Sequence, residues 1–135
     1  MKKKLLLLMT TLVIAILTGC SAVQVANPHS FNGLKLSPQG KSVAHISGFA
    51  NGIYFLCFPL ITGSTENVGS LAFFKNTITV TELTSAVTQE ASMLEADATI
   101  DLASSTTSTS FTIPPIPYPI FSWKSVYVSG NAIKK

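Results

Sequence analysis

Few residues of this chain belong to types that carry chemistry, and they are scattered. The 135 residues include two cysteines, two histidines, six acidic side chains and no arginine. The histidines are His29 and His45, and no His-x-His, Cys-x-x-Cys or Glu-x-x-His spacing accompanies either of them. Because a protein metal site needs several such ligands close together, we expect two ordinary histidines and no bound metal.

Glu95, Asp97 and Asp101 form the one acidic cluster of the sequence. A turn between a helix and a strand explains them better than a paired general acid and base does. The chain has no G-x-S-x-G motif and no glycine-rich phosphate loop, although its many serines leave a Ser-His-Asp site open on composition alone. Without arginine, bidentate binding of phosphate or carboxylate ligands is also disfavoured. We therefore expect a protein that is not an enzyme and that binds no cofactor.

The first twenty residues have the layout of a bacterial export signal. Lys2, Lys3 and Lys4 precede an apolar run over residues 5–17, and small residues and Cys20 follow this run at once. At about 1.5 Å per residue a helix over the run covers about 20 Å, whereas the hydrocarbon core of a bilayer is about 30 Å thick. The run is therefore expected to be a cleaved targeting segment and not a permanent membrane span.

Leu17, Thr18, Gly19 and Cys20 resemble the lipobox of bacterial lipoproteins. The resemblance implies that the Cys20 thiol receives a diacylglyceryl group, that the bond before Cys20 is cut, and that the new amino terminus is often acylated too. Two or three acyl chains of the palmitate type would hold the protein almost permanently on the membrane. Ser21, in place of an aspartate, implies sorting to an outer membrane, facing the periplasm, where the envelope is of the enterobacterial type. The alternative is a short N-terminal helix with an incidental cysteine.

Cleavage before Cys20 would change the charge of the protein. It would remove three of the nine lysines, and the six that remain would balance the six acidic side chains. The sequence pI near 9.0 would then belong to the targeting segment. Because no basic surface is left to bind a nucleic acid, we expect the partners to be membrane lipid and either an envelope protein or further copies of this chain.

Cys57 has no disulfide partner once Cys20 carries lipid. It lies in the apolar stretch IYFLCFPLI, so we expect a buried, inert thiol, with a reactive or metal-binding thiol as the alternative. The same stretch, residues 53–61, is rich in aromatic and branched residues and too short to span a membrane. It predicts a strand that is buried on both faces and that ends, or reaches a sheet edge, at Pro59.

The remaining mature chain divides into segments of clear pattern. Residues 21–40 contain Asn-Pro, Asn-Gly and Ser-Pro dipeptides, which are typical of a tether, although Phe31, Leu34 and Leu36 would also suit an irregular first strand. From Lys41 onward, alternating side chains predict the first strand of the folded domain.

Residues 79–98 have the strongest helical pattern. Thr79 and Glu82 fit the S/T-x-x-E capping box, in which side chains satisfy N–H groups at the start of a helix. Apolar residues recur at helical spacing, at Val80, Leu83, Val87, Ala91 and Leu94. One face of this helix is therefore expected to pack on a sheet.

The C-terminal segments predict two antiparallel strands. From Thr99 the pattern has a period of two and leads into SSTTSTS, which suits either an exposed extension of the strand or a flexible loop. Residues 113–121 are rich in proline and must be extended or turn-forming. Residues 123–133 alternate cleanly and predict the last strand.

Together these segments predict an α+β fold in which one amphipathic helix packs on a small, mainly antiparallel sheet of three to four strands. Residues 1–19 are expected to form the lipoprotein signal peptide, residues 20–40 the lipidated cysteine and its tether, and residues 41–135 the folded domain. One helix would leave the other face of such a sheet bare, so that the N-terminal segment or several associated copies would cover it.

Three stretches carry a resemblance to known proteins. ISGFANGIYFLCFPLITG, EADATIDL and VYVSGNAIK are similar to the core of small bacterial lipoproteins of the TRL-like group. The order strand, helix, strand, strand is also similar to dodecin-like domains, some of which assemble as rings. The similarity extends over most of the chain beyond Gly40 and concerns the fold more than the activity. No residues match the flavin site of dodecins, so no flavin is implied.

Two functions are compatible with these patterns. The first is a non-enzymatic structural or interaction module that offers a sheet edge, or the apolar residues of the proline segment, to an envelope partner or to copies of itself. Those residues are Ile116, Tyr118, Ile120, Phe121 and Trp123. The alternative is a carrier that faces the periplasm and binds a small apolar ligand between helix and sheet. Its contacts would be Tyr54, Phe55, Phe58 and Trp123.

Overall fold

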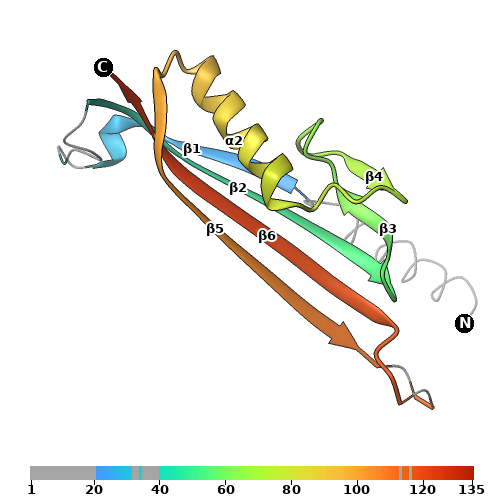
Figure 1. Cartoon of the computed structure of the whole chain (residues 1–135). Helices are drawn as coiled ribbons and strands as arrows, with labels where there is room; N and C mark the ends of the chain where they lie inside the picture. Colours follow the sequence, from blue (N-terminus) through green and yellow to red (C-terminus); the bar gives the residue numbers. More distant parts are fainter. Residues whose placement is uncertain (1–20, 32–33, 35–39, 113, 116) are drawn as a thin grey trace, which may run out of the picture.

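The computed structural model describes residues 21–31, 34, 40–112, 114–115 and 117–135. Within these residues the chain forms one six-stranded antiparallel sheet with a single α-helix on one face (Figure 1). In chain order the elements are β1 (Ser21–Ala26), the 3₁₀ helix η1 (Pro28–Phe31), β2 (Lys41–Phe55), β3 (Phe58–Gly63), β4 (Leu71–Phe73), α2 (Val80–Met93), β5 (Ala98–Phe111) and β6 (Phe121–Lys134).

The sheet is built around the long strand β2. The strand order is β4-β3-β2-β6-β5, and β1 pairs with β2 on the same side as β3. Residues 45–50 of β2 lie opposite β1, and residues 52–55 lie opposite β3. The prediction of a three- to four-stranded sheet is therefore wrong, because β1, the β2–β3 hairpin and β4 all add strands to it.

The stretch IYFLCFPLI forms a hairpin and not a single strand buried on both faces. β2 ends at Phe55, Leu56 and Cys57 make the turn, and β3 begins at Phe58. Leu56 has a φ of 56°, a conformation that Gly or Asn usually supplies, so the sequence carries no turn signal there. The turn also exposes the free thiol of Cys57, so the prediction of a buried thiol is wrong.

The first part of the predicted tether is also a strand. Ser21–Ala26 pairs antiparallel with β2, and Val23 and Val25 pack against the core from it. The buried Ser21 hydroxyl donates a hydrogen bond to the Ser64 carbonyl at 2.8 Å, which ties β1 to the loop after β3. Alternation over only six residues was too brief a signal to compete with the turn dipeptides that follow. Leu36 lies outside the described residues, and Leu34 is exposed.

Helix α2 begins as the sequence predicts and ends earlier. Thr79 is its N-cap, and the Thr79 hydroxyl accepts a hydrogen bond from the Glu82 N–H at 3.2 Å. The helix ends at Met93, since Leu94 is the C-cap and Glu95 has a φ of 57°. The chain then turns directly into β5, which begins at Ala98, the residue predicted to end the helix.

The core lies between α2 and one face of β2 and β6. Leu83, Val87 and Ala91 are the buried residues of the helix, as its apolar stripe predicts. A Cβ added at Gly48 would lie 3.1 Å from both Leu83 Cδ1 and Val87 Cγ2, so helix and sheet touch directly there. From the sheet, the buried residues of the core cluster are Ala44, Ile46, Ala50, Tyr54, Val126, Val128 and Ala132.

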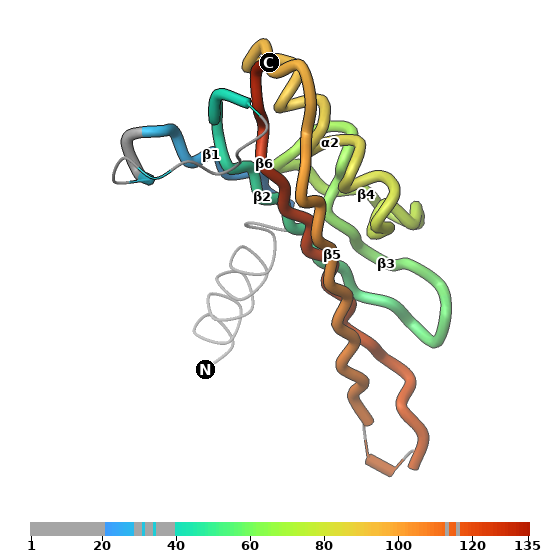
Figure 2. The backbone as a smooth tube through the Cα atoms, turned by 60° about the vertical axis from the view of Figure 1, so that its left-hand side comes forward, coloured from blue at the N-terminus to red at the C-terminus, as the bar shows by residue number. Residues whose placement is uncertain are grey.

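β5 and β6 form a long antiparallel hairpin across the proline segment, as predicted. SSTTSTS belongs to β5 throughout, so the structure takes the alternative of an exposed strand extension and not the flexible loop. Figure 2 shows that this hairpin continues well beyond the N-terminal end of α2, on the side away from the C-terminus. The molecule therefore has a helix-covered end and an end that consists of β-hairpins (Figure 1).

Candidate interaction surfaces

The predicted sorting motif lies just outside the described residues. Leu17, Thr18, Gly19 and Cys20 precede Ser21, the first residue of β1, which pairs with Ala50 of β2. Ser21 follows Cys20 directly in the sequence, so β1 begins at the residue after the predicted lipidation site. Among the described helices, none is long and apolar enough to cross a bilayer.

Strand β5 presents a long outer edge. It pairs with β6 on one side, and in the described part of the chain no strand pairs with its other side. Its residues from Asp101 to Phe111 are all exposed. Proteins usually protect such an edge with charges, proline or a bulge. Here a bulge and Asp101, with a φ of 53°, lie at one end only, and residues 102–111 contain no charge and no proline.

A row of large apolar side chains lies on the sheet face opposite α2, toward the hairpin end. Residues directly opposite each other in an antiparallel pair share a face. Phe49 pairs with Tyr127, Ile53 with Trp123 and Phe55 with Phe121. We call these six residues the apolar row. Phe49 and Tyr127 stack with ring centroids 6.2 Å apart, and the Phe55 and Phe121 rings lie 5.4 Å apart.

The apolar row borders a shallow groove of about 280 Å³. Ile53, Phe111, Phe121, Ser122 and Trp123 line it, and none of them carries a charge. The indole N–H of Trp123 donates to the Ser125 hydroxyl at 3.1 Å, which leaves the rest of the indole as an apolar surface. The groove is therefore suited to apolar groups.

The structure brings only part of the predicted contact residues together. Phe121 and Trp123 share the apolar row, while Phe58 and Tyr118 are exposed at the same end of the molecule. Ile116 lies outside the described residues. Ile120 is half-buried, and its carbonyl accepts a hydrogen bond from the Leu56 N–H at 2.7 Å, which joins the tips of the two hairpins.

Tyr54 does not belong to this surface, because it points to the helix-covered face. Its hydroxyl donates to Asn76 Oδ1 at 2.5 Å, and Lys124 Nζ lies 4.3 Å from the centroid of its ring. Burial raises the pKa of the Tyr54 hydroxyl above its ordinary value. These contacts make Tyr54 a structural residue of the core.

The other half of this sheet face is polar. His45 Nδ1 lies 2.8 Å from Asn131 Oδ1, and Asn131 Nδ2 donates to Asp101 Oδ2 at 3.1 Å. Because an amide oxygen can only accept, His45 donates through Nδ1 in this contact. A groove of about 470 Å³ lies beside it, lined by polar residues that include Gln24, Ser47 and Ser129 and, at its border with the apolar row, by Phe49 and Tyr127. In the described residues no three His, Cys, Asp or Glu side chains are grouped to hold a metal ion.

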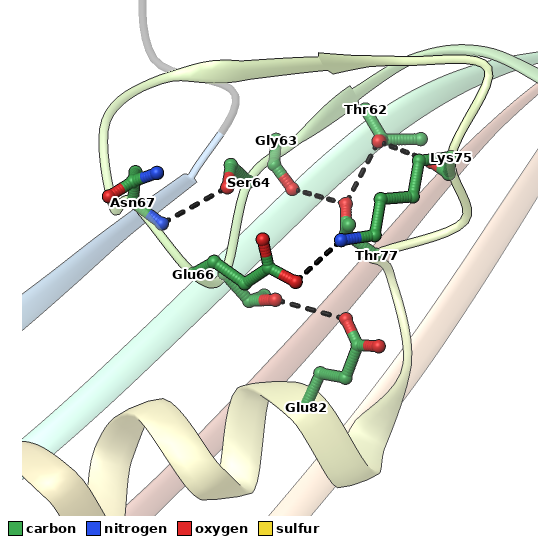
Figure 3. Close-up of polar contacts among 9 residues, drawn as sticks. Thr62, Gly63, Ser64, Glu66, Asn67, Lys75, Thr77 and Glu82 are labelled. Carbon is green, nitrogen blue, oxygen red and sulfur yellow. Dashed lines mark hydrogen bonds and ion pairs between the residues drawn. The ribbon is translucent and has the colours of Figure 1, made fainter.

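A second polar cluster holds the loop between β3 and β4 against the helix (Figure 3). Thr62 and Thr77 place their buried hydroxyls 2.9 Å apart, and Asn67 N–H donates to the Ser64 hydroxyl. Thr65 donates to the Glu82 carboxylate at 3.0 Å, so Glu82 reaches this loop instead of completing the predicted capping box. This cluster could not be predicted from the sequence, where its only signal is threonine in an apolar neighbourhood.

An exposed ion pair lies at the border of the same cluster. The Lys75 ammonium group donates to the Glu66 carboxylate (Figure 3). The hydrogen bond and the negative charge of Glu66 raise the pKa of Lys75. Exposed pairs of this kind add little stability, so the pair orients the loop more than it stabilises the fold.

Comparison with models of protein families, with curated proteins and with solved structures finds no match to this chain.

Proposed function

We propose that this chain is a lipid-anchored lipoprotein of the bacterial cell envelope, and that its domain is a non-enzymatic interaction module. Cys20 carries the lipid, and Leu17, Thr18 and Gly19 are the recognition site for cleavage. The proposed location is the outer membrane, on the side that faces the periplasm. The layout of the first twenty residues supports the anchor.

The observation that carries the interaction role is the unprotected edge of β5. Its backbone N–H and C=O groups are free to form a ladder with another extended strand, which is the usual mode of recognition by strand addition. Each backbone hydrogen bond formed in this way contributes about 0.5–1.5 kcal/mol net. The exposed side chains of residues 104–110 are all Ser or Thr, so a partner strand could pair with β5 in several registers. None of these side chains carries a charge that would repel a charged partner strand. The partner is a strand of an envelope protein or β5 of a second copy.

The membrane anchor strengthens this role by confining both partners to one surface. Two proteins tethered to the same surface meet at a higher effective concentration than the same proteins in solution. A modest strand-to-strand affinity is then sufficient for association.

The carrier function is less well supported. At Gly48 the helix and the sheet are in van der Waals contact, which leaves no space there for a ligand between them. The groove beside Trp123, at about 280 Å³, lies just below the range of about 300–1,000 Å³ usual for small-molecule sites. The groove beside His45, at about 470 Å³, lies within this range, but it is on the sheet face opposite the helix and not between helix and sheet, where the carrier function places its ligand.

Site-specific photo-crosslinking of the full chain in living bacteria tests the interaction role. A photoreactive residue at Ser105, on the β5 edge, should yield a discrete adduct, either with one envelope protein or with a second copy. The matched control places the same residue at Gln89, which is exposed on α2. Equal adduct patterns from the two positions, or no adduct from Ser105, would contradict docking on β5.

A charge on the edge should remove the adduct. Thr107→Lys puts an ammonium group on β5 next to the crosslinking position, and charges on an edge strand oppose strand addition. We expect the Ser105 adduct to disappear in this variant and to persist in Gln89→Lys, which carries the same charge on the helix. Persistence in both variants would mean that the adduct does not depend on β5.

A further inference from the structure

We propose that the apolar row lies on the lipid bilayer, so that the domain rests on the membrane through its hairpin end. This inference rests on the proposed lipidation of Cys20. It adds a second, non-covalent membrane contact made by Phe49, Ile53, Phe55, Phe121, Trp123 and Tyr127.

The attachment point of the lipid is the first step. Cys20 is bonded to Ser21, which is already part of a paired strand, so no spacer separates the anchor from the sheet. β1 runs antiparallel to β2, and Ser21 lies opposite Ala50. Phe55, at the end of β2, is five residues further on, or about 17 Å along the strand. An acyl group on Cys20 therefore holds this end of the sheet close to the bilayer.

The chemistry of the sheet face changes at the level of the anchor. From Phe49 to Phe55, and from Tyr127 to Phe121 on β6, the face opposite the helix carries the apolar row. In the other direction along the same face lie His45, Ser47 and their polar neighbours on β6. The interruption within the row is the pair Asn51 and Ser125, of which Ser125 accepts the indole hydrogen bond of Trp123.

Charges are segregated in the same direction. Residues 52–63 and 102–123, which make the hairpin end, contain no Lys, Asp or Glu. Lys124 comes next, but it lies on the helix side over the ring of Tyr54. The charged side chains near the opposite end of the sheet are Lys41, Glu95, Asp97, Asp101, Lys134 and Lys135. Lys75 and Glu66 lie beside β3, but they pair with each other in the cluster that contacts Glu82 of α2, on the helix side. A bilayer contact would therefore bury aromatic groups and no charge, as membrane interfaces favour.

The residues of the β2–β3 turn also support a bilayer contact at the hairpin end. Leu56 occupies a left-handed conformation with a φ of 56° and is 55% exposed, next to Phe58, which is 66% exposed. Gly or Asn would fit this backbone with less strain, and a polar residue would suit water better. Apolar side chains at an exposed turn are consistent with a site that meets lipid.

The geometry also fixes the orientation of the domain. If Ser21 lies at the level of the lipid headgroups, an upright sheet would push the hairpin end some 17 Å into the hydrocarbon, where open strand edges are not tolerated. A sheet tilted toward the membrane plane brings Ser21 and the apolar row to the surface together. Helix α2, on the other face, and the charged end then point away from the bilayer (Figure 1).

Trp123 reports on this contact directly, because it is the one tryptophan of the chain. The full chain is produced in bacteria, purified from membranes and reconstituted into phosphatidylcholine vesicles, with or without bromine near the ester end of the acyl chains. Bromine quenches tryptophan at short range. We expect the brominated vesicles to remove most of the Trp123 fluorescence. The intact mass of the same sample shows whether Cys20 is acylated.

The matched control moves the tryptophan to the other end. In the double variant Trp123→Phe and Met93→Trp, the indole sits at the end of α2, where Met93 is 64% exposed, and it should keep its fluorescence in brominated vesicles. Circular dichroism checks that this variant folds like the natural chain.

Four results would overturn the inference. An acylated chain whose Trp123 is not quenched would reject the bilayer contact and leave the lipid anchor intact. If Trp123 is not quenched and its emission wavelength also shifts when the vesicle-bound protein is diluted, the apolar row contacts a second copy of the chain instead of the bilayer. Equal quenching of Trp123 and of the tryptophan at position 93 would also reject an oriented contact. A chain without lipid would reject the proposed anchor, and the inference with it.

Discussion

At the scale of single residues, the Thr62 and Thr77 hydroxyls show how this small domain buries polar groups. The Thr62 hydroxyl is 2.8 Å from the Lys75 carbonyl, and the Thr77 hydroxyl is 2.7 Å from the Gly63 carbonyl. The two hydroxyls are also 2.9 Å from each other. The Thr62 hydroxyl is also 3.4 Å from the Ala72 carbonyl. Two hydroxyl protons are thus shared among several acceptors, so the two side chains act as one unit that joins β3 to the segment before α2.

This unit predicts a coupled loss of stability. Thr62→Val and Thr77→Val should each lower the free energy of unfolding by about 1–3 kcal/mol, because each leaves a buried partner unsatisfied. The double variant should lose less than the sum of the two. Urea unfolding measures all three, with Thr106→Val on the exposed part of β5 as the control. Single variants no less stable than Thr106→Val would show that the hydroxyls are not needed.

Tyr54 predicts a dependence of stability on high pH. Burial raises the pKa of its hydroxyl above the ordinary 10.0 in the folded protein. A raised pKa means that the folded state holds the proton more tightly than the unfolded state. Its contribution to stability is therefore complete below 10.0 and is lost as the pH rises through the higher folded-state pKa.

The measurement is the free energy of unfolding as a function of pH. The natural chain should lose stability as the pH passes 10.0, and Tyr54→Phe should lose less over the same range. Lys75, whose pKa is also raised, loses its contribution at high pH in both proteins, so the comparison isolates Tyr54. Parallel pH curves for the two proteins would contradict the assignment. Loss of the hydrogen bond to Asn76 lowers the Tyr54→Phe curve at every pH without changing its slope.

At the scale of elements, helix α2 depends on its N-cap. The Thr79 hydroxyl satisfies the Glu82 N–H, so Thr79→Ala should lower the free energy of unfolding by about 1 kcal/mol. Thr81→Ala is the control, because Thr81 is exposed in the first turn and alanine is the better helix former. Thermal or urea unfolding measures both. Equal effects of the two substitutions would mean that Thr79 does not act as a cap.

Much of the secondary structure could be predicted because its signals are local. The Thr79 cap, the buried stripe of Leu83, Val87 and Ala91, and the clean alternation of β6 all follow from spacing alone. The β2–β3 turn could not be predicted, since Leu56 and Cys57 are not turn residues and the apolar run hides the reversal of the chain. β1 could not be predicted because its main support is pairing with β2, a contact between distant residues.

The candidate surfaces were predicted less completely than the helix. Phe121 and Trp123 were expected to make contacts, and their period-two pattern places them on one face. Alternation does not say which face the helix covers, so Tyr54 was grouped with them although it points the other way. The edge position of β5 depends on the strand order, which no local pattern encodes.

At the scale of the whole molecule, exposed apolar residues and charged residues lie at opposite ends of the long axis of the sheet. One end carries the exposed hairpin tips and no charged residue between 102 and 123, and the other carries the charged residues around the end of β6. The first described residue, Ser21, pairs with Ala50, at the level along β2 where the apolar row begins. A lipid anchor on Cys20 would thus orient the domain on the membrane, with the apolar end near the bilayer. The edge of β5 would stay accessible to partner strands.

Lipidation of Cys20 is the central proposal for this protein, and the intact mass of the protein from bacterial membranes tests it most directly. We predict a chain that lacks residues 1–19 and carries the added mass of a diacylglyceryl group, usually with a further acyl chain. The variant Cys20→Ala should keep residues 1–19 and gain no lipid mass. A natural chain of unmodified mass, or the same processing in Cys20→Ala, would contradict the account.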